Sequence, residues 1–199
     1  VIEDRGWEGY VFDMQLKGDR VRASTALLGE HNLYNILAAA AAASTVGLDG
    51  IHIAGAIETF AAYTMRFNPV PSKGGYRIVD DSYNANPASM AAAVEALEGL
   101  PCEGRRIAVI GDMRELGERS RQYHRDLGRL LKRSSLWKVF LLGDLVEETF
   151  RELGSEKGAL LHDKAEVVGA VRAAVREGDV ILVKGSRLSR LEEVAEALR

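Results

Sequence analysis

The stretch that decides the fold reads Val79-Asp80-Asp81-Ser82-Tyr83-Asn84-Ala85-Asn86-Pro87. It follows a short apolar run at residues 76–79 and precedes residues 90–97, whose apolar side chains recur on one face of a helix. Asn86 suits the N-cap of that helix, and Pro87 then takes the first helical position, which needs no N–H. The polar cluster thus lies where a strand gives way to a helix, the place where open parallel sheets bind ligands. A loop that only caps the helix is the alternative.

Further apolar runs predict the rest of the sheet. Residues 107–110, 139–142 and 180–183 are short and uninterrupted, as strands buried on both faces of a parallel sheet are, and residues 159–161 form a weaker run. Helical segments alternate with these runs. Three pairs with capping-box spacing mark helix starts: Asp144 with Glu147, Asp163 with Glu166, and Ser189 with Glu192. The alternation predicts a Rossmann-like, doubly wound, mainly parallel α/β sheet.

The first third of the chain has a different pattern. Residues 8–28 alternate as a β-hairpin does, and residues 33–46 and 53–60 read as helices. Residues 67–75 contain two prolines and two glycines and are expected to form a linker. The predicted organisation is a first domain at residues 1–66, a linker at 67–75 and a second domain at 76–199.

Composition excludes several functional classes. The chain has 199 residues, 47% of them hydrophobic, and its formal net charge of −3 (26 basic minus 29 acidic) gives no general attraction to nucleic acid or anionic membrane. No apolar run approaches the roughly 20 residues that span a bilayer. Cys102 is the single cysteine, so no intramolecular disulfide forms, which fits a reducing cytoplasm. Separately, we expect a monomer. The chain opens without methionine and directly in strand-like sequence, so we expect it to be part of a longer protein.

Residues 80–87 resemble the signature that opens the C-terminal domain of the Mur ligase family. Three more stretches resemble that family in the same order: Gly29-Glu30-His31-Asn32-Leu33-Tyr34-Asn35, Val109-Ile110-Gly111-Asp112-Met113-Arg114-Glu115-Leu116-Gly117, and Leu182-Val183-Lys184-Gly185-Ser186-Arg187. The resemblance covers residues 8–198 and implies the end of an α/β ATPase domain followed by the C-terminal domain. Residues 82–87 are most similar to the members that add D-alanyl-D-alanine.

The resemblance implies a reaction in peptidoglycan precursor synthesis. ATP phosphorylates the terminal carboxylate of UDP-N-acetylmuramoyl tripeptide, and the amine of D-alanyl-D-alanine attacks the acyl phosphate. No phosphate-binding motif Gly-x-x-x-x-Gly-Lys-Ser/Thr occurs in the chain. In the family that loop and the ligands of Mg²⁺ lie upstream, so we expect the chain alone to be inactive as a ligase.

The resemblance also implies an ATP site made of Asn35, Arg66 and Asp81. Asn35 would contact adenine, because an amide both donates to and accepts from a purine edge. Arg66 would reach the phosphates with its fork of donors, and Asp81 would accept the ribose hydroxyls. From the residues alone, Asn32 is expected to be the N-cap of the alanine-rich helix.

A second group of residues is expected near the amino-acid substrate. Lys184, Ser186 and Arg187 lie in the turn after the last strand, where Lys184 or Arg187 would bind the dipeptide carboxylate. Asp112 would hold the substrate amine. The side chains expected to shape the loop or contact the second substrate are those of Tyr83, Asn84 and Asn86, of which Asn86 could serve only as a cap.

Two alternatives remain open at this point. One is another amide-forming ligase of the same superfamily, acting on a different amino acid or on folate. The other is a Rossmann-like binding module without catalysis, although no glycine-rich dinucleotide fingerprint follows Val79 or Ile110.

Overall fold

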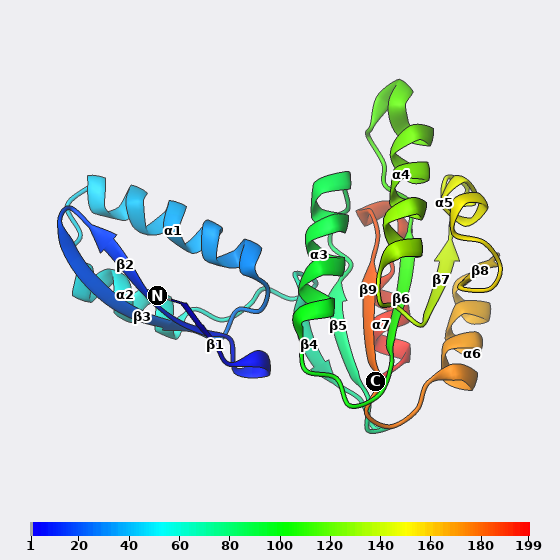
Figure 1. Cartoon of the computed structure of the whole chain (residues 1–199), viewed down its shortest axis with the longest axis horizontal. Coiled ribbons are helices and arrows are strands. Elements are labelled where there is room, and N and C mark those ends of the chain that lie inside the picture. The colour runs from blue at the N-terminus through cyan, green and yellow to red at the C-terminus, as the bar shows by residue number, and fades with distance from the viewer. Residues whose placement is uncertain (1) are drawn as a thin grey trace. The chain divides into compact units, whose positions relative to one another are not determined.

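A computed structural model describes residues 2–199 and divides into two compact units. Unit 1 comprises the chain up to Tyr63 together with Gly99–Pro101. Unit 2 comprises Thr64–Glu98 and Cys102–Arg199. Figure 1 shows the antiparallel ribbon of unit 1 in blue and the larger α/β sheet of unit 2 from green to red.

Unit 1 is built on a three-stranded antiparallel sheet in the order β1 (Ile2–Asp4), β2 (Tyr10–Leu16), β3 (Asp19–Thr25). Lys17 and Gly18 form the turn between β2 and β3 with φ of 48° and 96°, as tight hairpins require. A short 3₁₀ helix (Gly6–Glu8) precedes β2. The helices α1 (Glu30–Thr45) and α2 (Gly50–Thr59) follow the hairpin. The predicted hairpin and both helices are therefore confirmed.

The core of unit 1 lies between the hairpin and its helices. Alternate residues of β2 point to the helix side, so Phe12 and Met14 are buried there and Tyr10 and Leu16 pack at the margin. Further buried members come from β3, α1 and α2: Ala23, Leu33, Ile36, Ala40 and Ile53. The core is small, because only one helical layer covers the sheet.

Unit 2 contains a six-stranded sheet in the order β4-β5-β9-β6-β7-β8. Its strands are β4 (Asn68–Pro71), β5 (Arg77–Asp81), β6 (Arg106–Gly111), β7 (Lys138–Leu142), β8 (Gly158–Leu161) and β9 (Val180–Lys184). Every neighbouring pair is parallel except β4 with β5. The predicted strands and the doubly wound, mainly parallel fold are confirmed.

Helices cover both faces of this sheet (Figure 1). α3 (Pro87–Gly99) and α4 (Ser120–Arg133) cross one face, and α4 packs against α5 (Val146–Leu153). On the other face α6 (Lys164–Ala174) and α7 (Glu192–Ala197) bury Val167, Val171 and Val194 against the strands. Two 3₁₀ turns, Gly117–Arg119 and Arg187–Ser189, precede α4 and α7. No helix in residues 2–199 is both long and apolar enough to cross a membrane.

The segment expected to be a linker, residues 67–75, differs from that expectation because it contains strand β4. Pro69 and Pro71 lack an N–H, which an edge strand tolerates, and β4 pairs only with β5. Val70 is buried and anchors the strand to the core. The boundary between the compact units falls between Tyr63 and Thr64.

The three predicted capping boxes mark helix starts correctly, since α5, α6 and α7 begin at Val146, Lys164 and Glu192, but the cap itself forms in only one of the three. Asp163 accepts a hydrogen bond from the Glu166 N–H at 2.8 Å, as predicted. The Asp144 side chain is 97% exposed and does not cap α5. The N–H groups of Leu145 and Val146 at the start of α5 donate instead to the Asp112 carboxylate. Ser189 is separated from α7 by Arg190 and Leu191, and the left-handed conformation of Arg190 (φ 48°) breaks the capping geometry.

Candidate functional site

The loops that follow β5, β9 and β6 meet at one edge of the sheet. These three strands are parallel neighbours, so their carboxyl ends lie together, and the chain order reverses there as in other doubly wound sheets. The Ser186 N–H donates to the Asp112 carbonyl at 2.9 Å, which joins the loop after β9 to the loop after β6. The three motifs in unit 2, residues 80–87, 109–117 and 182–187, therefore converge at this edge. Arg66 reaches the same edge from the segment before β4, where the Tyr83 N–H donates to the neighbouring Met65 carbonyl.

Asp81 and Lys184 end two adjacent strands and form an ion pair. They face each other in register, and Lys184 Nζ lies 2.7 Å from Asp81 Oδ2. The Lys184 side chain is only 2% exposed, and its ammonium also donates to the Asn84 carbonyl at 3.0 Å. Asp81 Oδ1 accepts from the Phe67 N–H at 3.1 Å. This geometry does not support Lys184 as an open cation for a substrate carboxylate, because the side chain is buried and paired.

The loop between β5 and α3 is held by local hydrogen bonds. Asn86 Oδ1 accepts from the Ser89 N–H at 2.8 Å and Ser89 Oγ accepts from the Asn86 N–H at 3.0 Å, which confirms Asn86 as the cap of α3. Asn84 Oδ1 accepts from the Ala85 N–H at 2.8 Å. Asp80 accepts from the Ser82 hydroxyl and N–H, and burial raises the pKa of its carboxyl above the usual range.

Arg66 and Tyr83 form an exposed pair beside this loop. The Arg66 guanidinium carbon lies 4.3 Å from the centre of the Tyr83 ring, within cation–π range. The Tyr83 N–H donates to the Met65 carbonyl at 3.1 Å, which fixes the two segments to each other. Met65 and Phe67, on either side of Arg66, have positive φ of 63° and 47°, a strained conformation that functional segments often hold.

Asp112 was expected to hold a substrate amine, but in the structure its carboxylate is hydrogen-bonded to groups of the protein itself. Its side chain is 1% exposed. Oδ1 accepts from the N–H groups of Leu145 and Val146 at the start of α5, at 2.9 and 3.0 Å, and Oδ2 accepts from Arg114 at 2.7 Å. A carboxylate at a helix N-terminus satisfies donors that would otherwise be unpaired. Asp112 therefore supports the loop and has little surface left for a ligand.

Sequence reasoning missed His124, which secures the same loop from α4. The ring is fully buried, its Nε2 accepts from the Met113 N–H at 3.1 Å, and its Nδ1 lies 2.8 Å from the Ser120 carbonyl. These partners require a neutral ring with its proton on Nδ1. The only sequence signal was a histidine within an otherwise charged helical segment.

The turn after β9 presents an exposed cation, Arg187. Ser186 is 3% exposed, and its Oγ lies 3.4 Å from Ser189 Oγ, so it belongs to the turn itself. The Arg187 side chain is 53% exposed and pairs with Glu192 at 2.6 Å. It also lies 3.9 Å from the Met65 sulfur. Arg187 can therefore meet a ligand, whereas Ser186 and Lys184 shape the turn.

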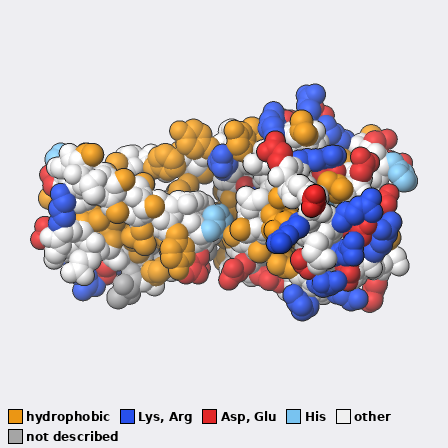
Figure 2. Space-filling view, turned by 90° about the horizontal axis from the view of Figure 1, so that it is seen from above, with side chains coloured by type: hydrophobic (Ala, Val, Ile, Leu, Met, Phe, Trp, Pro, Cys, Tyr) orange, Lys and Arg blue, Asp and Glu red, His pale blue; other side chains and the backbone are white. Residues whose placement is uncertain are grey.

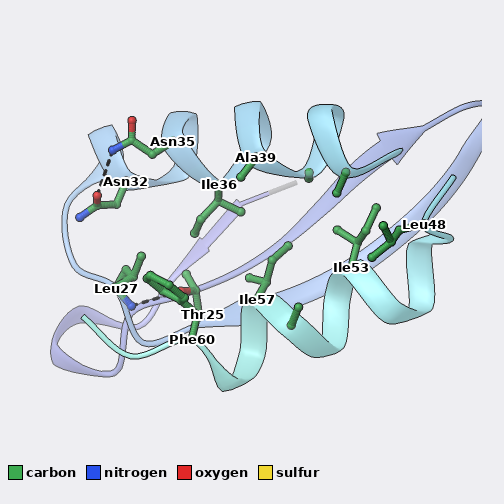
Figure 3. A pocket seen from close by; sticks show the side chains of 13 residues that line it. Thr25, Leu27, Asn32, Asn35, Ile36, Ala39, Leu48, Ile53, Ile57 and Phe60 are labelled. Carbon is green, nitrogen blue, oxygen red and sulfur yellow. Dashed lines mark hydrogen bonds between the residues drawn. The ribbon is translucent and has the colours of Figure 1, made fainter. Parts of the chain in front are cut away.

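Asn35 lies in unit 1, on the first half of α1. Its amide donates to Asn32 Oδ1 at 3.2 Å, at one end of a cavity of about 430 Å³ between α1 and α2 (Figure 3). The rest of the wall is mainly apolar, with Leu27, Ile57 and Phe60 among its members. The predicted N-cap role of Asn32 is wrong: α1 begins at Glu30, and Asn32 donates to the Leu28 carbonyl at 2.8 Å.

Charge is distributed unevenly over the visible faces (Figure 2). Basic and acidic side chains are interspersed over unit 2, while the view of unit 1 shows mostly apolar and neutral groups. Many of the arginines of α4 are paired, for example Arg125 with Glu148 and Arg129 with Glu152. Within residues 2–199 no three His, Cys, Asp or Glu side chains are grouped to hold a metal ion.

Comparisons with known proteins place these residues in context. Residues 65–187 match the family model described as "Mur ligase, glutamate ligase domain". The chain is 35% identical over 193 residues to the UDP-N-acetylmuramoyl-tripeptide–D-alanyl-D-alanine ligase of Escherichia coli, covering 96% of this chain and 42% of that protein. It therefore spans about two fifths of the length of the curated relatives it matches.

Solved structures agree with that match. The crystal structure of MurF from Acinetobacter baumannii aligns with a TM-score of 0.87 and 28% identity, covering 99% of this chain and 43% of that one. MurF ligase from Thermotoga maritima, solved in complex with ADP, aligns with a TM-score of 0.79 and 30% identity, covering 100% and 45%.

Proposed function

This chain belongs to the Mur ligase family, and on that premise we propose that the full-length protein uses ATP to join D-alanyl-D-alanine to UDP-N-acetylmuramoyl tripeptide. The observation that carries the proposal is the identity of 30–35% to ligases of that name over most of this chain. The MurF structure in complex with ADP supports the choice of nucleotide. A cytoplasmic, monomeric enzyme of peptidoglycan precursor synthesis is part of the proposal.

The nucleotide would contact three residues of this chain. Asn35 offers an exposed amide beside an apolar cavity, a combination suited to a purine base. Arg66 offers an exposed guanidinium to the phosphates. Asp81 keeps one lone pair on each carboxylate oxygen beyond its bonds to Lys184 and Phe67, so it can still accept ribose hydroxyls.

The dipeptide would bind at the exposed side of the same sheet edge. Arg187 is exposed whereas Lys184 is buried, so of these two residues we assign Arg187 to the dipeptide carboxylate. Tyr83 and Asn84 are exposed on the neighbouring loop and would bound the dipeptide. Asp112, Ser186 and Asn86 would act through the loop shapes that they maintain.

In the proposed reaction the γ-phosphoryl group of ATP passes to the tripeptide carboxylate. The dipeptide amine then attacks the acyl carbon, an amide bond forms, and phosphate leaves. The role of this chain is to position the nucleotide and the amine, because orientation alone lowers such barriers substantially. Magnesium would neutralise phosphate charge when bound, and the residues described here supply no site for it. We expect no ligase activity from the 199-residue chain alone, because it contains no Gly-x-x-x-x-Gly-Lys-Ser/Thr loop to hold the phosphates.

The test is phosphate release by the full-length protein with ATP, magnesium and UDP-N-acetylmuramoyl tripeptide. We expect release that depends on D-alanyl-D-alanine and not on single amino acids. Phosphate release with another acceptor would indicate a different amide ligase of the superfamily. No phosphate release with any acceptor would contradict the proposal and favour a binding module without catalysis.

A further inference from the structure

We infer that Lys184 is a positioning residue, which holds Asp81 and the loop of residues 82–86 in the orientation that nucleotide binding needs. The inference rests on the proposed function, because it assigns Asp81 to the nucleotide. It differs from the sequence expectation that Lys184 itself meets the dipeptide carboxylate. Three features of the structure carry it: burial, register and the choice of partners.

Burial removes Lys184 from direct contact with a ligand. Its side chain is 2% exposed, whereas Arg187, three residues later, is 53% exposed. A buried ammonium is tolerated only when it is paired and hydrogen-bonded, and Lys184 has both an ion pair and a carbonyl acceptor. Because the side chain is 2% exposed, a dipeptide carboxylate could reach Nζ only if Asp81 or the loop of Asn84 moved away from it. Movement of Asp81 would leave its carboxylate without its ion-pair partner.

Register explains why one lysine controls both partners. Asp81 and Lys184 are opposite residues at the ends of parallel neighbours β5 and β9, so the ammonium reaches the carboxylate without leaving the sheet. The Asn84 carbonyl lies three residues beyond Asp81, in the loop that turns into α3. Lys184 thus links the end of β9 to the end of β5 and to the loop that follows it.

The remaining support of Asp81 is insufficient to fix its carboxylate. Without Lys184, the Asp81 carboxylate would still accept from the Phe67 N–H at 3.1 Å, through Oδ1. In that bond only the acceptor is charged, whereas both groups of the Lys184–Asp81 pair are charged, and the Phe67 bond leaves Oδ2 free to rotate away. The Asn84 carbonyl would also lose its ammonium donor. Nucleotide affinity should therefore fall even though Lys184 does not touch the nucleotide.

The experiment uses the full-length protein and the variants K184M, D81N and K184M/D81N. Methionine keeps the length of the lysine stem while removing its charge and donors. K157M is the matched control. Lys157 also donates to two carbonyls, those of Leu131 and Ser134, at 2.7 and 2.6 Å. It precedes β8, however, and so lies at the amino edge of the sheet, away from the proposed site. KM for ATP, KM for D-alanyl-D-alanine and kcat are measured for each, together with the unfolding temperature.

We expect K184M and D81N each to raise KM for ATP by about tenfold. The double variant should have a KM for ATP no higher than that of the poorer single variant, because both substitutions act through the Asp81 carboxylate. KM for the dipeptide should stay within about twofold, and K157M should leave both values unchanged while lowering the unfolding temperature. If K184M does not fold, K184M/D81N replaces it, since that variant leaves no unpaired buried charge.

Three results would overturn the inference. One is a rise in KM for the dipeptide alone, which would make Lys184 a substrate ligand. Another is a double variant about tenfold worse than D81N in KM for ATP, which would show that Lys184 acts independently of Asp81. The third is a K184M protein with unchanged KM for ATP. Failure of the proposed function is distinguishable, because the wild-type protein would then show no dipeptide-dependent turnover.

Discussion

Replacing Arg105 with methionine should destabilise unit 2 more than the same replacement of an exposed arginine would. Asp179 is 2% exposed, and Arg105 donates to it from its backbone N–H at 2.7 Å, from Nε at 3.3 Å and from Nη2 at 2.7 Å. Arg105 also donates to the Ala174 carbonyl and lies 3.8 Å over the Trp137 ring. This one side chain therefore joins the start of β6 to the segment between α6 and β9.

The expected loss follows from what R105M leaves behind. Removing one partner of a buried ion pair costs about 3–5 kcal/mol, because the other charge stays buried. Asp179 keeps the backbone donors of Arg105 and Arg176, and the lost side chain was 23% exposed, so the low end applies. We expect a loss of about 3 kcal/mol, part of it from the cation–π contact.

The assay is urea unfolding of the 199-residue chain followed by tryptophan fluorescence. A Trp7→Phe background leaves Trp137 as the reporter of unit 2. Arg119→Met is the matched control, because that exposed arginine should change stability by no more than about 0.5 kcal/mol. The reasoning would be refuted if R105M lowered the free energy of unfolding no more than the control does. It would also be refuted if R105M cost the same free energy of unfolding in a D179N background as in the wild-type background.

The pH dependence gives this prediction a second test. Burial alone would raise the pKa of the Asp179 carboxyl, but hydrogen bonds from Arg105 and Arg176 hold that pKa below its usual range. The folded-state pKa is lowered, so the stabilisation is present above the unfolded value of about 3.9 and is lost as pH falls through the folded pKa. The difference in the free energy of unfolding between wild type and R105M should therefore become smaller in acid. A difference that stays constant with pH would contradict the Arg105–Asp179 pair as its source.

Three further predictions concern the carboxyl edge of the sheet. D112A should lower stability by about 2–4 kcal/mol, because two N–H groups of α5 and Arg114 lose their acceptor; an unchanged urea midpoint would disprove this. N86A should lower stability by about 1 kcal/mol through loss of the α3 cap, with A88G as a helix-propensity comparison. D80N should raise the unfolding temperature at neutral pH, because burial raises the pKa of Asp80 and penalises its ionised form. That gain should fade as pH falls below the raised pKa, and a gain that persists in acid would point to another cause.

The sequence sufficed for the sheet because its signals are local and strong. Runs such as residues 107–110 and 180–183 are too apolar for anything but a buried strand, and both lie in the centre of the sheet. Asn86 followed by Pro87 marked the start of α3 correctly, because both preferences arise within one turn of the helix. Convergence of the motifs followed from parallel strands having their carboxyl ends together.

The errors came from partners that are distant in sequence. Asp144 had the right spacing for a cap, but Asp112, more than thirty residues earlier, reaches the same N–H groups from the next strand. The prolines of residues 67–75 suggested a linker, and only the vacant edge beside β5 explains why they form β4. Lys184 looked like an open cation because its partner, Asp81, lies on a strand that is adjacent only in the fold.

The polar residues of these motifs divide into two groups by exposure, and the division has a physical cause. Asp112, Lys184 and Ser186 are buried, and an unpaired polar group there would be unfavourable, so each is bonded to a neighbouring loop or turn. Those bonds fix the loops from which Arg66, Tyr83 and Arg187 project into solvent. A ligand site needs both groups, since exposed side chains bind with little ordering penalty only when the backbone beneath them is already held. A motif read from sequence contains the two groups mixed together, and only burial separates the residues that support the site from those able to touch a ligand.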